Sequence, residues 1–219
     1  MENDWQANCQ RMVKEQIERR GLTHPALLDA LRRVPRHLFV PESSRDYAYS
    51  DGPIPIGHGQ TISQPYIVAL MTSLLDLQGN ETVLEVGTGS GYQAAVLSHL
   101  AKNVHSVERI PELAEQAARV LGALEIHNVH IHVSDGSIGW QAAAPYEGIL
   151  VTAAAPHAPQ PLLEQLAEGG RLVIPVGARA YQELQVWRRC GKIFEHEPLI
   201  GVAFVPLRGA EGWQEDQWE

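Results

Sequence analysis

The sequence predicts an α/β fold of the Rossmann-like class: a doubly wound, mostly parallel sheet with antiparallel strands at its C-terminal edge and a helical N-terminal extension. The first observation is residues 83–95, Val-Leu-Glu-Val-Gly-Thr-Gly-Ser-Gly-Tyr-Gln-Ala-Ala, which have the pattern of a strand, a tight glycine turn and a helix start. The second is that short apolar runs alternate with helical patterns from there to residue 176, which is typical of a parallel sheet covered on both faces. The third is that the strand-like runs after residue 184 have no helix between them, so we expect antiparallel pairing there.

The composition is that of one globular domain, or of one domain with an appendage. The chain has 219 residues, 44% of them hydrophobic and 20% charged. A chain of this length can bury a full hydrophobic core without disulfide bonds or a structural metal ion. Its net charge of −9 argues against nucleic acid as a partner, because such binding depends on Lys and Arg. No apolar run approaches the ~20 residues that span a bilayer, the first residues are polar, and the two cysteines lack metal-ligand spacing. We therefore expect a cytoplasmic protein with free thiols and no membrane partner.

Two helices are predicted at the N-terminus. Apolar residues recur at helical spacing over residues 5–20, and Gly21 follows as the expected C-cap. Thr23 is placed to cap a second helix, which Pro35 closes. Residues 35–65 then hold five prolines and three glycines, which predicts a long irregular segment. Long ordered loops inside a compact domain are often functional.

After this segment the chain alternates between helical and strand-like patterns. The expected helices are at residues 67–75, 92–100, 112–121 and 161–167. The expected strands are at residues 82–86, 104–108, 129–133, 148–152 and 171–176, followed by antiparallel runs at 184–189, 193–197 and 199–207. The acidic tail at 211–219 is expected to be poorly ordered. The chain thus divides into N-terminal helices with a loop at 1–80, an α/β core at 81–208 and a tail at 209–219, all within one compact domain.

The glycine turn predicts a nucleotide-type ligand, and its spacing narrows the choice. Gly87, Gly89 and Gly91 stand at alternate positions, whereas dinucleotide-binding loops have the spacing Gly-x-Gly-x-x-Gly. Glu85 precedes them, and an anion-binding loop has little use for a carboxylate at that place. S-adenosylmethionine, a cationic ligand without phosphate, therefore fits better than NAD. A glycine turn with no ligand is the alternative.

Polar residues at the carboxyl ends of the other strands are further candidates, because ligands of doubly wound sheets bind at that edge. Glu108 can accept both hydroxyls of a ribose, or can simply pair with Arg109. Asp135 can accept from an adenine amino group while the next N–H donates to the ring, or the Asp135-Gly136 pair is only a turn. Small residues at 152–155 leave room for a ligand or a substrate chain, or only pack closely. The residues expected to contact the cofactor are Ile62, Glu85, Gly87, Thr88, Gly89, Gly91, Glu108, Asp135 and Gly136.

Residues 56–66, Ile-Gly-His-Gly-Gln-Thr-Ile-Ser-Gln-Pro-Tyr, gather hydrogen-bonding side chains just before a helix. Ser63 or Gln64 can cap that helix. A cap explains one of these side chains but not so many in one loop, whereas a loop that grips a substrate explains them all. The residues expected to contact the substrate are His58, Gln60, Thr61, Gln64, Thr152 and Ala153.

The sequence contains no motif of a zinc site, a hydrolase or a phosphate-binding loop. Of the ten histidines, His127, His130 and His132 cluster beside and within an expected strand, but their spacing fits no standard zinc pattern. Surface histidines are the better interpretation. There is no Gly-x-Ser-x-Gly elbow of a hydrolase and no Gly-Lys-[Ser/Thr] phosphate loop. We therefore expect no metal site.

The chain closely resembles the protein-L-isoaspartate O-methyltransferase family over nearly its whole length, up to about residue 208. The glycine loop alone would indicate only a class I methyltransferase, but Thr-Ile-Ser-Gln-Pro at residues 61–65 is specific to the isoaspartate branch. The other matching pieces run in the family's order and are residues 34–36, 39–41, 56–69, 83–95, 106–110, 149–154, 169–177 and 204–207. By this resemblance Ser63 takes the active-site position, and Glu85, Gly87, Glu108, Asp135 and Gly136 take cofactor positions.

The resemblance implies methyl transfer from S-adenosylmethionine to the free carboxylate of L-isoaspartyl residues in damaged proteins and peptides, which begins their repair. That carboxylate is already ionised at about pH 7, so no strong general base is required. We expect Ser63 to orient it through a hydrogen bond, the loop at 57–65 to act as grip and lid, and the enzyme to be a monomer. Two rivals remain: a methyltransferase for a small molecule or RNA, and a non-catalytic binding protein that keeps the cofactor fold.

The chain also departs from the family's pattern. At residues 134–137, Ser-Asp-Gly-Ser lacks the aromatic residue that commonly follows Gly-Asp-Gly in the family, although the Asp-Gly pair is kept. Ala203 stands where the family often has arginine, which puts the affinity for peptide in doubt. The tail with Trp213 and Trp218 matches nothing in the pattern.

Overall fold

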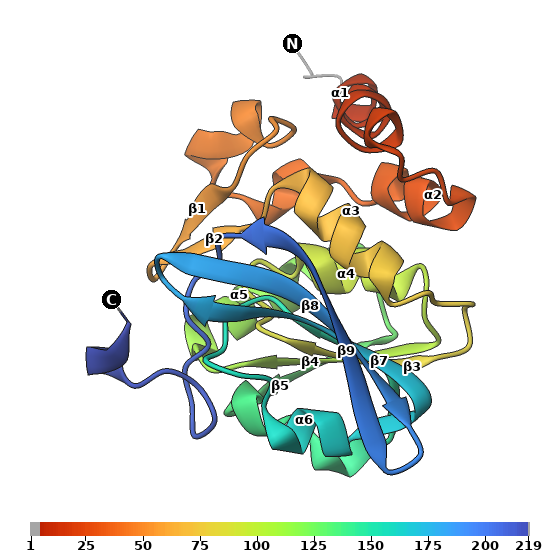
Figure 1. The fold of residues 1–219 in the computed structure, drawn as a ribbon. Coiled ribbons are helices and arrows are strands. Elements are labelled where there is room, and N and C mark those ends of the chain that lie inside the picture. Colours follow the sequence, from red (N-terminus) through yellow and green to blue (C-terminus); the bar gives the residue numbers. More distant parts are fainter. Residues whose placement is uncertain (1–4, 219) are drawn as a thin grey trace.

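A seven-stranded sheet runs through the molecule in the order β5-β4-β3-β6-β7-β8-β9 (Figure 1). The computed structural model describes residues 5–218, so the polar start of the chain at residues 1–4 and the last residue of the tail lie outside the described part. The strands are β3 (Thr82–Val86), β4 (Asn103–Glu108), β5 (Val129–Val133), β6 (Tyr146–Val151), β7 (Leu166–Ala178), β8 (Tyr181–Cys190) and β9 (Ile193–Val202). The predicted fold class is confirmed.

The first five strands of this order are parallel, and β8 and β9 add in antiparallel fashion at one edge, as predicted. β3 lies between β4 and β6, so the chain builds the sheet first to one side of β3 and then to the other. The carboxyl ends of β3, β4 and β6 therefore meet where the strand order reverses. This is the position at which doubly wound sheets bind their ligands.

Helices cover both faces of the sheet (Figure 1). They are α1 (Trp5–Met12), α2 (Pro25–Arg33), α3 (Pro65–Leu74), α4 (Tyr92–Ser98), α5 (Pro111–Ala123) and α6 (Gln160–Glu164). Shorter π-helical or 3-10 turns lie at Val13–Ile17, Glu18–Arg20, Arg36–Phe39, Glu42–Tyr47, Gly136–Ile138, Gln141–Ala143 and Glu215–Gln217. Val83 packs in one core with Met71 of α3 and Leu97 of α4, whereas its neighbour Leu84 packs in another with Leu162 of α6. Alternate residues of β3 thus face two cores, as expected for a sheet buried on both sides.

The N-terminal helices follow the prediction except at one cap. The helical run expected over residues 5–20 continues beyond α1 as a π-helical and a 3-10 turn, and it ends at Gly21, whose φ is 91°. Pro25 occupies the first helical position of α2, so its N-cap is His24, whose side chain makes no capping bond. The prediction that Thr23 caps this helix is therefore wrong.

The segment 35–65 contains a hairpin that the sequence did not reveal. Strand β1 (Ile54–Gly57) pairs in antiparallel fashion with β2 (Gln60–Ile62). The turn between them is left-handed at three successive residues, with φ of 94° at Gly57, 52° at His58 and 70° at Gly59. Strands this short, next to prolines, carry too little alternation to be distinguished from a loop.

The C-terminal part differs from the prediction in its last strand. β9 is one strand where two were expected, because Pro198 lies opposite Gln185 at an irregularity of the ladder, and β9 is an edge strand that tolerates a residue without an N–H. The poor order expected of the tail stays a prediction. The N–H of Trp213 donates to the Leu207 carbonyl at 2.8 Å, and a 3-10 turn follows. The start of the tail is thereby fixed to the core.

Two general expectations can also be compared with the structure. No helix within residues 5–218 is long and apolar enough to cross a bilayer. Both cysteines are free, as predicted, with Cys9 buried and Cys190 half-buried. Burial raises the pKa of the Cys9 thiol to about 11, so this group is not a reactive thiolate.

Candidate active site

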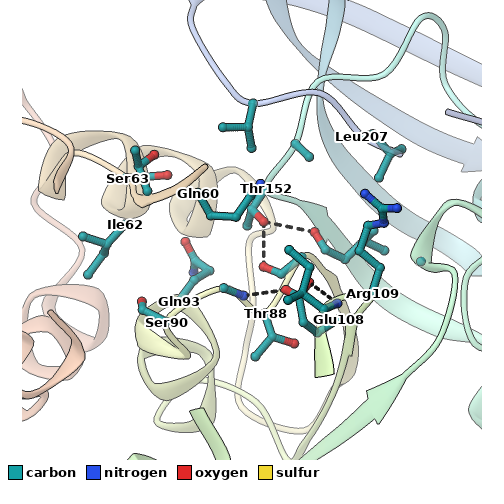
Figure 2. A pocket seen from close by; sticks show the side chains of 18 of the residues that line it. Gln60, Ile62, Ser63, Thr88, Ser90, Gln93, Glu108, Arg109, Thr152 and Leu207 are labelled. Carbon is teal, nitrogen blue, oxygen red and sulfur yellow. Dashed lines mark hydrogen bonds between the residues drawn. The ribbon is translucent and has the colours of Figure 1, made fainter. Parts of the chain in front are cut away.

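A pocket of about 300 Å³ opens at the carboxyl ends of β3, β4 and β6. Its walls come from the glycine loop after β3, the ends of β4 and β6, the loop that includes β2, and the C-terminal segment after β9. Figure 2 shows Ile62 and Ser63 on one side of this pocket and Glu108 and Arg109 on the other. The loop predicted to hold the cofactor and the loop predicted to hold the substrate therefore face the same cavity.

The three glycines of the loop after β3 all have positive φ, with 96° at Gly87, 52° at Gly89 and 86° at Gly91. Gly87 is the most restricted, because a Cβ there would lie 2.3 Å from Oγ1 of Thr152. Gly87, Thr88 and Gly89 line the pocket. Gly91 does not, and instead serves as the left-handed N-cap of α4.

Thr152 and Ala153, just after the end of β6, line the pocket, and their contact with the substrate stays a prediction. The Thr152 hydroxyl donates to the Gly87 carbonyl at 2.7 Å and lies 3.1 Å from the Val86 carbonyl (Figure 2). This hydroxyl therefore holds the glycine loop in place. The sequence argument assigned Thr152 only to the substrate and missed this contact between two loops.

Glu108 ends β4 and is 5% exposed, so it is not the solvated strand-end residue of the alternative interpretation. Its Oε2 accepts the N–H of Gly89 at 2.8 Å, and its Oε1 accepts the N–H of Ile110 at 3.0 Å. Each carboxylate oxygen has a second lone pair left for a further donor. The carboxylate lines the pocket, where a ribose would meet it.

Glu85 lies beneath the glycine loop and is fully buried, outside the set of residues that line the pocket. The Ser106 hydroxyl donates to Oε2, and Oε1 has no hydrogen-bond partner in the described structure. Burial raises the pKa of Glu85 to about 8, with a further increase from the charge of Glu108 and an opposing effect of the Ser106 bond. This raised pKa favours the protonated form of the side chain at neutral pH. The expected role of Glu85 toward the cofactor stays a prediction.

The Asp135 carboxylate accepts hydrogen bonds from within the protein. Of the Asp135-Gly136 pair, Gly136 lines the pocket and Asp135 does not. Oδ1 of Asp135 accepts the N–H of Ser137 at 2.9 Å and its hydroxyl at 2.7 Å. Oδ2 accepts the N–H of Ala210 at 2.7 Å, from the C-terminal segment. Gly136 is tightly enclosed, since a Cβ there would lie 2.7 Å from Cγ1 of Val86. The alternative interpretation of this pair as a turn thus describes the Asp135 side chain well.

The loop after the hairpin brings Gln60, Thr61, Ile62 and Ser63 to the pocket together. Within the described part of the chain the Ser63 hydroxyl makes no hydrogen bond, whereas the Ser63 carbonyl accepts one from Arg36. The other two predicted substrate residues, His58 and Gln64, do not line the pocket. The Gln64 side chain instead donates to Asp51 at 2.8 Å, and Gln64 is the N-cap residue of α3 without a side-chain cap bond.

Several pocket residues were not found by sequence reasoning. The C-terminal segment supplies a whole wall, which is held by the N–H of Leu207 donating to the Ala154 carbonyl at 2.8 Å. Residues 204–207 are among the pieces that match the family's pattern, but no contact with a ligand was predicted for them. The remaining lining residues without an earlier assignment are Gly59, Val68, Met71, Val86, Ser90, Tyr92, Gln93, Val107, Arg109, Ile110, Val205, Pro206, Leu207 and Arg208.

The histidines lie away from the pocket. His105 on β4 is 3.0 Å from His132 on β5, between their ring nitrogens, and His132 stacks on Trp140 with 4.0 Å between centroids. Desolvation lowers the pKa of both His105 and His132, and the neighbouring histidines lower these pKa values further. Within residues 5–218, no group of three or more His, Cys, Asp or Glu side chains has a geometry that could hold a metal ion.

Comparison with known sequences gives one consistent result. The family model described as Protein-L-isoaspartate(D-aspartate) O-methyltransferase matches residues 7–212. A relative named protein-L-isoaspartate O-methyltransferase from Trichlorobacter lovleyi is 56% identical over 205 residues, which is 93% of this chain and 94% of the relative. A relative of the same name from Methanoregula boonei is 53% identical over 204 residues, with 93% and 94% covered.

Solved structures agree with this result. A structure named protein-L-isoaspartate O-methyltransferase superposes with a TM-score of 0.84 at 28% identity, covering 93% of this chain and 67% of its own. A putative enzyme of the same kind from Plasmodium falciparum, in complex with S-adenosyl-L-homocysteine, gives a TM-score of 0.80 at 24% identity, with 92% and 98% covered. The second likeness supports the fold alone.

Proposed function

The chain belongs to the protein-L-isoaspartate(D-aspartate) O-methyltransferase family, and from this membership we propose how its pocket carries out the family's reaction. The enzyme transfers a methyl group from S-adenosylmethionine to the free carboxylate of L-isoaspartyl residues in damaged proteins and peptides. That transfer starts the repair of these residues to aspartate. The observation that carries the assignment of roles is that the glycine loop and the free hydroxyl of Ser63 line one cavity.

We propose that the cofactor lies along the glycine loop. S-adenosylmethionine supplies an electrophilic methyl group when it is bound. The residues present fit such a ligand, because Gly87 and Gly89 expose bare backbone and Glu108 keeps lone pairs for ribose hydroxyls. Gly136 also lines the pocket, and because it has no side chain of its own it leaves room there for a flat ring. The roles of Ile62, Thr88, Gly91, Glu85 and Asp135 stay predictions.

The substrate carboxylate, in this proposal, meets the loop of Gln60, Thr61 and Ser63. The carboxylate is ionised near pH 7, so the protein needs to orient it rather than to deprotonate it. Ser63 donates one hydrogen bond to it, and the hydroxyl is available because no side chain in residues 5–218 uses it. Thr152 and Ala153 line the same cavity. Closure of this pocket excludes water, and alignment of the reacting atoms in a water-poor cavity provides most of the acceleration.

The wider setting of the enzyme is also part of the proposal. We expect it to act as a monomer in the cytoplasm on proteins and peptides, and not on nucleic acid or at a membrane. The net charge of −9 and the two free thiols support this setting. Residues 1–80 would provide the substrate side, residues 81–208 the cofactor core, and residues 209–219 an appended tail.

The deciding experiment compares two peptides that differ only in one linkage. Transfer of labelled methyl groups from S-adenosylmethionine is measured with an L-isoaspartyl peptide and with its normal aspartyl twin. We expect incorporation into the first peptide alone. Incorporation into both peptides, or into a small molecule or RNA but into neither peptide, would favour another methyltransferase. Binding of the cofactor without any transfer would favour a non-catalytic protein.

A further inference from the structure

Arg36 is a fully buried guanidinium beside the pocket, in the 3-10 turn Arg36–Phe39. Its Nε donates to the Ala48 carbonyl and its Nη2 to the Ser63 carbonyl, each at 2.7 Å. The guanidinium carbon lies 4.7 Å from the ring centroid of Tyr92. One side chain therefore joins three segments that are distant in the sequence.

A charge in this position is costly for the fold. Arginine stays protonated in proteins, and within the described residues no carboxylate lies at ion-pair distance from Arg36. Two backbone carbonyls and an aromatic face compensate only part of the loss of hydration, and Nη1 has no hydrogen-bond partner among residues 5–218. A buried apolar side chain of similar size would avoid this cost. What the guanidinium provides instead is directional contact with the Ser63 backbone.

Two of the residues that Arg36 contacts, Ser63 and Tyr92, line the pocket. Ser63 lines the pocket, and its carbonyl is the acceptor, so the guanidinium fixes the backbone of the loop while the hydroxyl stays free. Tyr92 also lines the pocket and directly follows Gly91 at the start of α4. Arg36 thus links the Ser63 loop to α4, the helix that starts at the glycine loop.

We propose that Arg36 is a positioning residue for the methyl transfer, which holds the backbone of Ser63 at a fixed place relative to the cofactor loop. This inference rests on the proposed role of Ser63. A small misplacement of a reacting carboxylate lowers the rate steeply, so loss of the guanidinium affects turnover more than it affects cofactor binding.

Two variants test the proposal, together with a matched control. Arg36→Met keeps the length of the side chain but removes every donor, and Arg36→Lys keeps the charge and can reach one carbonyl but not both. The control is Arg171→Met, because Arg171 also donates to a backbone carbonyl, that of Leu74 at 3.1 Å, but Leu74, unlike Ser63, does not line the pocket. All proteins are assayed well below their melting temperatures with an L-isoaspartyl peptide. Dissociation constants for S-adenosylmethionine are measured by calorimetry.

For Arg36→Met we expect kcat to fall by about tenfold or more, with the cofactor dissociation constant within about threefold of the parent. Arg36→Lys should lie between this variant and the parent, and Arg171→Met should keep its turnover. Amide exchange should become faster in residues 59–64 of Arg36→Met and stay unchanged in β3 and β6. In a Ser63→Ala background the effect of Arg36→Met on kcat should shrink, because the hydroxyl that it positions is gone.

Unchanged turnover in Arg36→Met, equal losses in Arg36→Met and Arg171→Met, or unchanged exchange in residues 59–64 would each overturn the inference. If Arg36→Met does not fold, Arg36→Lys carries the same tests. A Ser63→Ala enzyme with full turnover would overturn the proposed role of Ser63. An impaired Ser63→Ala enzyme beside an unimpaired Arg36→Met enzyme would overturn the role of Arg36 alone.

Discussion

The backbone N–H of Gly89 donates a hydrogen bond to Oε2 of Glu108 over 2.8 Å, and this bond joins the glycine loop to the end of the neighbouring strand. The other oxygen of the same carboxylate holds the N–H of Ile110 at 3.0 Å. Glu108 therefore shapes the floor of the pocket before any ligand arrives. A ligand hydroxyl that reaches this carboxylate finds acceptors whose positions are already fixed, which reduces the entropy that binding costs.

We expect Glu108→Ala to weaken binding of S-adenosylmethionine by ~1–3 kcal/mol, because the ribose hydroxyls and the N–H of Gly89 lose their acceptor. Calorimetric titration of the cofactor measures this change directly. Glu112→Ala is the control, since Glu112 is an exposed carboxylate in the first turn of α5. Equal dissociation constants for Glu108→Ala and the parent would contradict the ribose assignment.

Ser63→Ala should slow methylation of an isoaspartyl peptide by roughly 10- to 100-fold, which is the rate equivalent of a hydrogen bond to a charged group. Cofactor binding should stay nearly the same, because the contact with Arg36 uses the Ser63 carbonyl and survives the substitution. Steady-state kinetics and calorimetry separate the two effects. Ser43→Ala, at an exposed serine of the 3-10 turn Glu42–Tyr47, controls for a hydroxyl loss elsewhere. Unaltered turnover would remove Ser63 from its role.

Much of the fold was predictable because the inner strands are buried and the helical patterns between them are clear. The apolar run of β3 and the alternating run Val-His-Ile-His-Val of β5 located these two strands to the residue, and the glycine turn located the start of α4. The hairpin β1–β2 was not predictable, since its strands are short and lie between prolines. The prediction of two strands separated at Pro198 was wrong. The sequence does not reveal that β9 forms an edge of the sheet, where proline is tolerated.

The site was predictable only where function depends on local backbone or on the end of a strand. Gly87 and Glu108 were found on such grounds, whereas Ser63 was assigned through the resemblance of its loop to the family's pattern, and all three line the pocket. Contacts between distant segments gave no local signal. Asp135 stood at the expected strand end, but its carboxylate is used by Ala210, 75 positions later, and nothing near Asp135 indicates this partner.

Gly87→Ala should damage the enzyme more than Gly89→Ala. A Cβ at Gly87 would lie 2.3 Å from the Thr152 hydroxyl, in a residue whose φ is 96°, whereas a Cβ at Gly89 would meet its nearest atom at 3.6 Å with φ of 52°. We expect strain of ~1–3 kcal/mol for Gly87→Ala and about 1 kcal/mol for Gly89→Ala in the free energy of unfolding. Denaturant titration measures both values. The reverse order would show that Thr152 does not constrain the loop.

The stability of the ligand-free enzyme should depend on pH through Glu85. Burial raises the pKa of this group from 4.5 to about 8, so the native state keeps a proton that the unfolded chain has already released. The contribution of Glu85 is therefore complete below about pH 4.5 and is lost as the pH rises towards about pH 8. Its size is on the order of a few kcal/mol.

Glu85→Gln removes this dependence, because an amide has the shape of the protonated carboxyl group but does not ionise. The free energy of unfolding of the parent should fall relative to that of Glu85→Gln as the pH rises from about 5 to about 8. Urea titrations of both proteins at several pH values give the difference. Parallel pH profiles for the two proteins would mean that Glu85 is ionised in the native fold throughout this range.

The C-terminal segment should contribute to cofactor binding through the turn at Gly136. The Ala210 N–H donates to Asp135 at 2.7 Å, and the Trp213 N–H donates to the Leu207 carbonyl at 2.8 Å. These bonds hold two parts of the pocket wall in place, the turn at Gly136 and the segment at Leu207. A chain that ends after Arg208 loses both bonds, and one that ends after Gln214 keeps both. We expect the shorter chain to bind S-adenosylmethionine about fivefold to tenfold more weakly than the longer one, the equivalent of about 1 kcal/mol for a lost contact. Calorimetry on the two truncated chains makes the comparison, and melting temperatures show that both are folded. If the two chains bind equally, the C-terminal segment covers the pocket without supporting it, because only the longer chain keeps the bonds from residues 210–213 to Asp135, Ser137 and Leu207.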